Sequence, residues 1–177
     1  MKMKFGHVIV DGPDAVGKST LAEFVEKIFG FKSVHSDAKS KNDYEYHSDL
    51  LHADESKFYD RFMAGEYVYP RIYGRDAKLT ISEMEKLMKE IIDTNSLYVI
   101  MNTSDTDILI RRLAERKEFH YFKEMSPQVQ HFRDFAYIFE SYFEKYDNFI
   151  YFDINQPDAY DKLYDKVKSF IDSRLNA

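Results

Sequence analysis

The stretch that decides the fold is GPDAVGKS, residues 12–19, which fits the pattern G-x-x-x-x-G-K-[ST] at every fixed position. It follows an apolar run that ends at Val8-Ile9-Val10 and precedes an amphipathic segment, residues 19–29. A strand, a glycine-rich loop and a helix in this order can bind a phosphate, because the glycines let consecutive N–H groups turn toward it and the helix N-terminus adds positive charge. The sequence therefore predicts a phosphate-binding loop.

The fixed positions of this loop have separate chemical roles in the prediction. Lys18 would reach the β- and γ-phosphates of ATP, and the hydroxyl of Ser19 would ligate Mg²⁺. ATP and Mg²⁺ are therefore the expected cofactors. The other residues expected to bind them belong to the loop and to the start of the helix: Gly12, Ala15, Val16, Gly17 and Thr20.

The remaining sequence favours a kinase among the proteins that carry such a loop. GTPases read guanine with an N-K-x-D motif on a late strand, and residues 101–103 and 153–155, which follow the last two predicted strands, do not supply it. Large ATPases need a longer chain than these 177 residues. Phosphoryl transfer to a small acceptor is the remaining function.

Composition limits the partners and the setting. A chain of 177 residues, 44% of them hydrophobic, suits one domain over residues 1–177. The net charge of −6 argues against a duplex nucleic acid as partner. The absence of cysteine excludes disulfides and fits a reducing cytosol, and the sequence has neither a signal-peptide core nor an apolar run of the roughly 20 residues that a membrane span needs. We expect a cytoplasmic protein that makes no contact with a membrane.

Apolar runs alternate with helical patterns along the whole chain. Strands are expected at residues 5–10, 31–35, 56–62, 97–101 and 149–154. Helices are expected at residues 19–29, from a capping box at Thr80 and Glu83, from Ser126-Pro127 with Pro at the first helical position, and at the C-terminus. Strands that read as continuous apolar runs are typical of a parallel sheet covered on both faces. The expected class is α/β, with five parallel strands.

Three blocks of the sequence resemble thymidylate kinases and the related deoxynucleoside kinases, including short phage-type members. In the first block, residues 11–20, an acidic residue lies inside the phosphate loop. In the second, residues 60–70, Asp-Arg-Phe and the residues that follow are similar to D-R-Y-x-x-S-x-x-A-Y-Q. In the third, residues 112–118 resemble the R-x-x-x-R-G-E of the family's mobile lid. The resemblance implies a P-loop kinase fold with helices on both faces of the sheet, a short lid at about residues 104–125, and a homodimer.

The resemblance also implies roles for the acidic residue of the loop and for the Asp-Arg pair. Asp14 would accept a hydrogen bond from a sugar hydroxyl of the acceptor. In this family the third strand lies beside the first, which would place Asp60 next to Ser19 and its Mg²⁺. Arg61 would then grip the phosphate of the acceptor with its fork of N–H donors.

The lid and the base pocket supply the other candidate residues. Arg112 and Arg116 are spaced i, i+4, so one helical face could close over ATP and neutralise charge during transfer. Tyr69, Arg71 and Arg75 follow the Asp-Arg block and could hold the acceptor's base.

Because the sequence departs from the family's pattern at several positions, it does not determine the identity of the acceptor. Gly65 and Pro70 stand where the family has Ser and Gln, so base recognition must differ. We predict ATP-dependent phosphorylation of a deoxynucleoside monophosphate, with dTMP or a related pyrimidine as the small-molecule acceptor. One alternative is a deoxynucleoside kinase with Asp37 as its general base. The other is a nucleotide-binding switch that is not a kinase.

Overall fold

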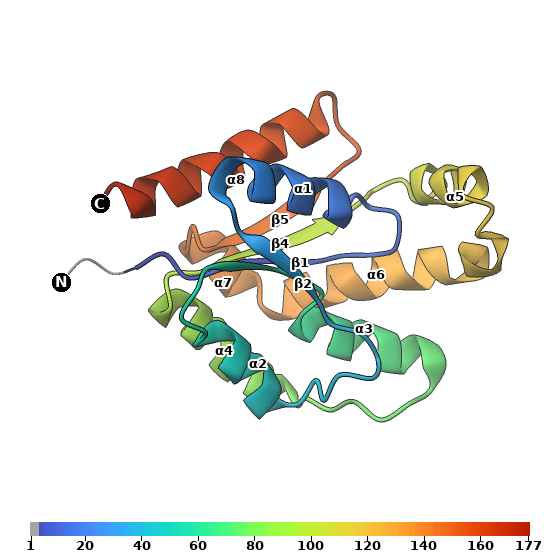
Figure 1. Ribbon diagram of the computed structural model, residues 1–177. Coiled ribbons are helices and arrows are strands. Elements are labelled where there is room, and N and C mark those ends of the chain that lie inside the picture. Colours follow the sequence, from blue (N-terminus) through green and yellow to red (C-terminus); the bar gives the residue numbers. More distant parts are fainter. Residues whose placement is uncertain (1–3) are drawn as a thin grey trace.

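Five parallel strands form the central sheet of the computed structural model, which describes residues 4–177 (Figure 1). They are β1 (Val8–Asp11), β2 (Lys32–His35), β3 (Lys57–Asp60), β4 (Leu97–Asn102) and β5 (Phe149–Asp153). Their order is β2-β3-β1-β4-β5, and every neighbouring pair is parallel. The predicted sheet is confirmed, and the third strand lies beside the first.

Helices cover both faces of this sheet, as expected for a parallel sheet. In Figure 1, α1 (Lys18–Phe29) and α8 (Ala159–Leu175) lie on one face. The other face is covered by α2 (Tyr44–Leu51), α3 (Met63–Tyr73), α4 (Ile81–Asp93), α6 (Phe122–Ile138) and α7 (Glu140–Lys145). Beyond the end of β4 lie α5 (Thr106–Glu115) and the short 3-10 helix η1 (Phe119–Tyr121).

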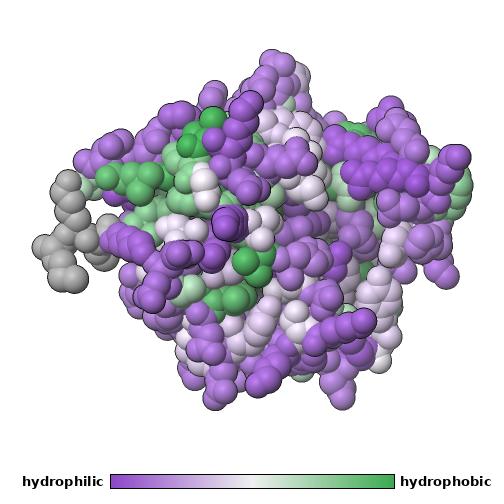
Figure 2. Space-filling view, viewed as in Figure 1, coloured by the Kyte–Doolittle hydropathy of each residue, from purple (hydrophilic) through white to green (hydrophobic). Residues whose placement is uncertain are grey.

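Alternation along the strands divides the core into two apolar clusters. In β1, Val8 and Val10 pack with the residues of α1 and α8, whereas Ile9 packs with those of α3 and α4. Successive side chains of a strand point to opposite faces, so a run that is apolar throughout buries both. On the face shown in Figure 2 the surface is mostly hydrophilic, with small hydrophobic patches. Within residues 4–177, none of the helices combines the length and the apolar character that crossing a membrane requires.

One predicted helix start is confirmed and another is wrong. The Thr80 hydroxyl accepts from the backbone N–H of Glu83, and the Glu83 carboxylate accepts from that of Thr80, which completes the capping box of α4. By contrast, α6 begins at Phe122 and contains Pro127 in its interior. Pro127 removes the hydrogen bond to the Lys123 carbonyl, but both residues are exposed, so water can satisfy that carbonyl.

A buried histidine makes the stability of the fold depend on pH. The ring of His7 accepts from the Lys57 N–H through Nδ1 (3.2 Å), so the proton is on Nε2, which donates to the Leu51 carbonyl (3.1 Å). Burial lowers the pKa of His7 from 6.5 to about 4. Between these two pH values His7 is mostly protonated in the unfolded chain and mostly neutral in the folded chain. Stability is therefore lost as the pH falls from 6.5 to 4, by up to about 1.4 kcal/mol per pH unit.

We expect the free energy of unfolding of the wild type, compared with that of His7→Gln, to decline between pH 7 and pH 4.5. Urea unfolding at four pH values gives the free energy of unfolding of both proteins. Because the variant keeps every other titrating group, the difference between the two proteins reports on His7 alone. A difference between the two that stays constant with pH would show that His7 is not the responsible group.

Candidate active site

The loop between β1 and α1 needs its glycines for steric reasons. Gly17 is the N-cap of α1 and has a left-handed backbone, with φ 104° and ψ 22°. A Cβ at Gly12 would lie 2.2 Å from the Met101 carbonyl oxygen, and one at Gly17 would lie 2.8 Å from the Tyr160 ring. Neither position accepts a side chain without displacing its neighbours. The predicted strand, loop and helix are therefore present, and α1 starts at Lys18.

Two side chains from other helices, α5 and α8, bind carbonyl groups of the loop. Arg112 donates from Nη1 to the carbonyl of Ala15 (2.9 Å) and to the Tyr160 hydroxyl (2.6 Å). The Tyr160 hydroxyl in turn donates to the carbonyl of Val16 (2.8 Å). These bonds fix the orientation of the peptide units on which a phosphate-binding loop depends.

Lys18 lies inside the loop. Its side chain is largely buried, and Nζ donates to the carbonyls of Gly12 (2.8 Å) and Pro13 (2.9 Å). Burial lowers the pKa of the Lys18 ammonium, and the nearby carboxylates of Asp60 and Asp14 oppose that shift. The cation is thus held in a partly desolvated place, where it interacts strongly with anionic groups.

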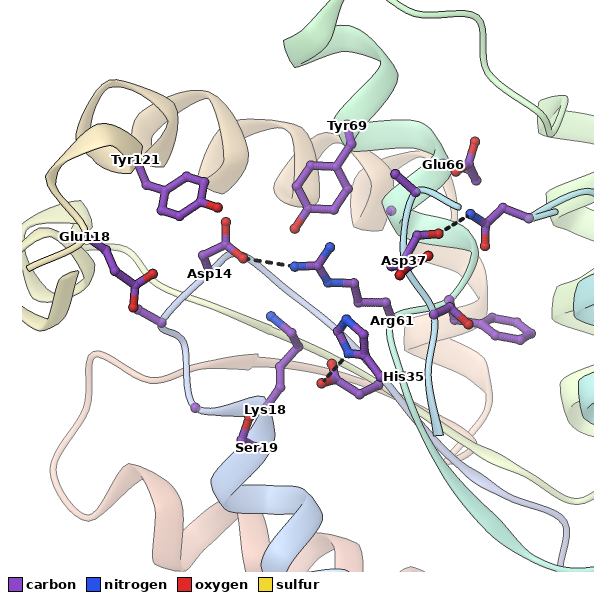
Figure 3. A pocket seen from close by; sticks show the side chains of 18 of the residues that line it. Asp14, Lys18, Ser19, His35, Asp37, Arg61, Glu66, Tyr69, Glu118 and Tyr121 are labelled. Atoms are coloured by element: carbon purple, nitrogen blue, oxygen red, sulfur yellow. Dashed lines mark hydrogen bonds and ion pairs between the residues drawn. The ribbon is translucent and has the colours of Figure 1, made fainter. Parts of the chain in front are cut away.

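A cavity of about 410 Å³ opens beside Lys18 (Figure 3). Most of the predicted site residues line it: Asp14, Ala15, Gly17, Lys18, Ser19, Thr20, Asp37, Asp60, Arg61, Tyr69, Arg75 and Arg116. His35, Asn42 and Tyr73, which the sequence also suggested for this cleft, line it as well. The other lining residues are Ser36, Ala38, Phe62, Gly65, Glu66, Leu113, Glu118 and Tyr121. The volume is in the range of small-molecule sites.

A fully buried carboxylate positions the turn after β3. Asp11 accepts from the N–H groups of Phe62 (2.9 Å) and Ala64 (3.2 Å) and from the Tyr98 hydroxyl (2.6 Å). It therefore caps α3 from β1, since the N-cap residue Phe62 makes no side-chain cap of its own. Burial raises the pKa of Asp11, whereas these donors favour the charged form. The cap holds Arg61 in a left-handed conformation, with φ 73°.

Asp14 is held by partners from two other elements. Its Oδ1 accepts from Arg61 Nη2 (3.2 Å), and its Oδ2 accepts from Gln128 Nε2 (3.0 Å). Gln128 also accepts from the backbone N–H of Asp14 (2.9 Å), so the amide grips this loop residue at two points. Gln128 is buried on α6, and nothing in the local sequence signals its role.

Three buried polar atoms at the cavity have no hydrogen-bond partner within residues 4–177: Nε of Arg61, the hydroxyl of Tyr69 and Oδ1 of Asp60. Burial raises the pKa of Tyr69, which keeps the hydroxyl neutral and able to donate. Oδ2 of Asp60 is already bound to His35 Nδ1 (3.1 Å). Buried polar groups are normally paired, so these atoms indicate where a ligand binds.

Asp60 and Ser19 could supply oxygen ligands to a magnesium ion. The free oxygen of Asp60 and the hydroxyl of Ser19 both line the cavity, and Mg²⁺ prefers such oxygen ligands. The described part of the chain contains no cluster of three or more His, Cys, Asp or Glu side chains that could hold a metal by themselves.

Comparison with known proteins identifies the fold. No protein-family model matches the chain, and no curated protein matches it. The YorR protein of Bacillus subtilis, solved in complex with phosphorylated GDP, is 19% identical with a TM-score of 0.76, over 97% of this chain and 98% of that chain. The chain has the P-loop kinase fold.

Two further structures share this P-loop kinase fold. A gluconokinase of Sinorhizobium meliloti 1021 is 14% identical with a TM-score of 0.60, over 99% of this chain and 95% of that chain. A deoxyadenosine kinase of M. mycoides, solved with the products dCMP and a flexible dCDP, is 13% identical with a TM-score of 0.52, over 96% of each chain. At these identities the likeness establishes the fold and leaves the substrate open.

The segment expected to form the lid of this P-loop kinase fold separates its two arginines. Arg116 lines the cavity together with Leu113, Glu118 and Tyr121, and Figure 3 shows the last two on the Asp14 side. Arg112 is instead bound to the loop carbonyl of Ala15. The spacing i, i+4 therefore does not bring both guanidinium groups to the same place.

Two other predicted residues have local partners. Oδ1 of Asp37 accepts from the N–H groups of Lys39 (2.8 Å) and Ser40 (3.2 Å), which lowers the pKa of this carboxyl and makes it a weaker base. Arg71 donates to the Tyr67 carbonyl (2.6 Å), and its guanidinium lies 3.7 Å from the centre of the Tyr67 ring. Arg71 therefore packs on its own helix, and Arg75 is the arginine from this region that lines the cavity.

Proposed function

We propose that this protein transfers the γ-phosphoryl group of ATP to a nucleoside monophosphate, with dTMP or a related pyrimidine deoxynucleotide as the first candidate. One observation carries the proposal. Arg61 and Tyr69 both line the cavity that begins at Lys18, and each has a buried donor, Nε and the hydroxyl respectively, that has no partner among residues 4–177. Donors of this kind suit the ionised oxygens of an acceptor phosphate.

On the donor side, the loop N–H groups and Lys18 bind the phosphates of ATP. Lys18 already lies where its charge is poorly solvated, so it favours the negative charge that develops during transfer. Ser19 and Asp60 would hold Mg²⁺, which would neutralise charge on the phosphates. Arg116 faces the same cavity from the lid and can add a second cation.

On the acceptor side, Arg61 and Tyr69 orient the attacking phosphate. A phosphate oxygen is ionised at neutral pH and needs no general base, whereas a nucleoside hydroxyl does. The carboxylate proposed as that base, Asp37, is engaged in its own turn and has a lowered pKa. Asp14, fixed by Gln128, has oxygen lone pairs left to accept a hydrogen bond from a sugar hydroxyl. These features favour the monophosphate over the nucleoside.

A panel of acceptors tests the proposal. ADP release is measured with ATP·Mg²⁺ and, in turn, deoxynucleoside monophosphates, the matching nucleosides, gluconate and no acceptor. We expect a deoxynucleoside monophosphate to give the highest kcat/KM. If only nucleosides or only gluconate were phosphorylated, that compound would be the acceptor and the proposed monophosphate would be wrong. Hydrolysis that no acceptor accelerates would favour the nucleotide-binding switch.

The lid arginine offers a matched pair of variants. We expect Arg116→Ala to lower kcat by at least ~10²-fold, because a cation that faces the transferred group is lost. Thermal stability should change by less than ~0.5 kcal/mol, as is usual at exposed positions. Arg111→Ala is the control, because Arg111 lies on the same segment and contacts the Asp107 carbonyl (3.4 Å). Steady-state kinetics measure kcat for both variants. Equal kcat values for Arg116→Ala and Arg111→Ala would mean that Arg116 does not assist transfer.

A further inference from the structure

The end of the cavity away from Lys18 contains an ion pair between the buried Glu66 and the partly exposed Arg75, which the phosphate chemistry does not use. Glu66 belongs to α3, is only 4% exposed and lines the cavity together with Arg75. Figure 3 shows Glu66 and Lys18 on opposite sides of Tyr69 and Arg61. A phosphate held by Arg61 therefore leaves the rest of the acceptor room to extend toward Glu66.

The backbone after α3 brings Arg75 to this place. Gly74 ends the helix in a left-handed conformation, with φ 65°, and its N–H bonds the Pro70 carbonyl. The N–H of Arg75 bonds the same carbonyl (3.1 Å), so the chain turns back over the last turn of α3. This turn directs Arg75 to Glu66, nine residues earlier in the chain, rather than outward.

The Glu66–Arg75 pair has more unused hydrogen-bond donors than unused acceptors. Glu66 accepts from Arg75 Nη1 (3.2 Å) and Nη2 (3.0 Å) and from the backbone N–H of Lys78 (3.2 Å). Most of the carboxylate's accepting capacity is therefore occupied. The guanidinium still has its Nε–H and further Nη protons, of which one meets the Asp76 carbonyl only at 3.5 Å.

The walls between the two ends of the cavity are aromatic. Phe62, Tyr69 and Tyr73 line it, and the rings of Tyr69 and Tyr73 are stacked with centroids 6.2 Å apart. A planar heterocycle can pack along such side chains, so its edge would meet the donors of Arg75. A carbonyl oxygen at that edge would be paired, whereas an amino group would oppose donor to donor and leave both unpaired.

We propose that Glu66 positions Arg75 as the element that selects the acceptor's base, in favour of a base with an oxo group and against one with an amino group at the same ring position. This inference rests on the proposed function and adds the class of base. One donor–acceptor match of this kind discriminates by about 10-fold to 100-fold. The class includes uracil, thymine and guanine and excludes cytosine and adenine.

Two pairs of acceptors test the inference. dUMP and dCMP share sugar, phosphate and ring and differ at one exocyclic group, and dGMP and dAMP supply the purine pair. We expect kcat/KM for the oxo member to exceed that for the amino member by at least ~10-fold in the wild type. In the double variant Glu66→Gln/Arg75→Met the ratio should fall below ~3-fold. Gln can still accept from the Lys78 N–H, and neither partner is left as an unpaired buried charge.

A control variant and two outcomes complete the design. Arg71→Met removes an arginine from the same helix that packs on Tyr67, and it should keep the wild-type ratio. An amino member used as well as its oxo partner in the wild type, or a ratio unchanged in the double variant, overturns the inference but leaves the monophosphate kinase standing. If neither dTMP nor any of these four nucleotides is turned over, the proposed function is overturned, and the inference falls with it.

Discussion

Lys18→Ala is expected to reduce phosphoryl transfer by at least ~10³-fold while the protein keeps a cooperative thermal transition. The ammonium is the cation of the phosphate loop, and within residues 4–177 its hydrogen bonds go to the backbone carbonyls of Gly12 and Pro13. Its charge acts chiefly on the transition state, where charge on the transferred group is redistributed. Its removal also ends the cost of keeping a charge in a buried place, so the fold should lose little stability.

Single-turnover rates at saturating ATP·Mg²⁺, together with calorimetric melting, measure the two effects separately. Lys27→Ala is the matched control, because Lys27 lies in the last turn of the same helix and is exposed. A wild-type rate of phosphoryl transfer in the Lys18→Ala variant would contradict the proposal that this protein is a kinase. A variant that fails to melt cooperatively would instead assign Lys18 a structural role.

Arg61→Ala is expected to raise KM for dTMP by about 10²-fold and to abolish the preference for dTMP over thymidine. In the wild type we expect that preference to be at least ~10-fold in kcat/KM, a difference of about 1.4 kcal/mol. The reason is that Arg61 lines the cavity, has a buried Nε donor without a partner within residues 4–177, and is held beside Asp14 (3.2 Å). The acceptor's phosphate loses its charged, forked partner in the variant.

Arg61→Lys is the companion variant, because it keeps the charge and loses the fork, and it should have an intermediate KM. Arg61 already has a positive φ, so alanine at this position adds no new backbone strain. KM for ATP should change little. If thymidine is phosphorylated efficiently and dTMP not at all by the wild type, the nucleoside kinase is the correct alternative.

Predictions from the sequence were confirmed where a few neighbouring residues determine the structure. They failed where the surroundings in the folded protein determine where a helix starts. The capping box at Thr80 lies within four residues, so its outcome followed from residue types alone. The helix start at Pro127 was wrong, because exposed Pro127 and Lys123 tolerate the missing bond and α6 continues back to Phe122. Helix α3, with Gly65 and Pro70, gave no helical signal.

The sequence by itself determined the phosphate loop, the five strands and the class of the fold. The loop needs glycines at particular positions, and the central strands β1 and β4 are buried runs rich in apolar residues; both signals act over a few neighbouring positions. The tertiary structure alone decided which polar groups meet in the cavity. Gln128 is 114 positions from Asp14 along the chain, and Tyr98 is 87 from Asp11. Such contacts depend on how helices pack on the sheet, and no local pattern of residue types encodes that geometry.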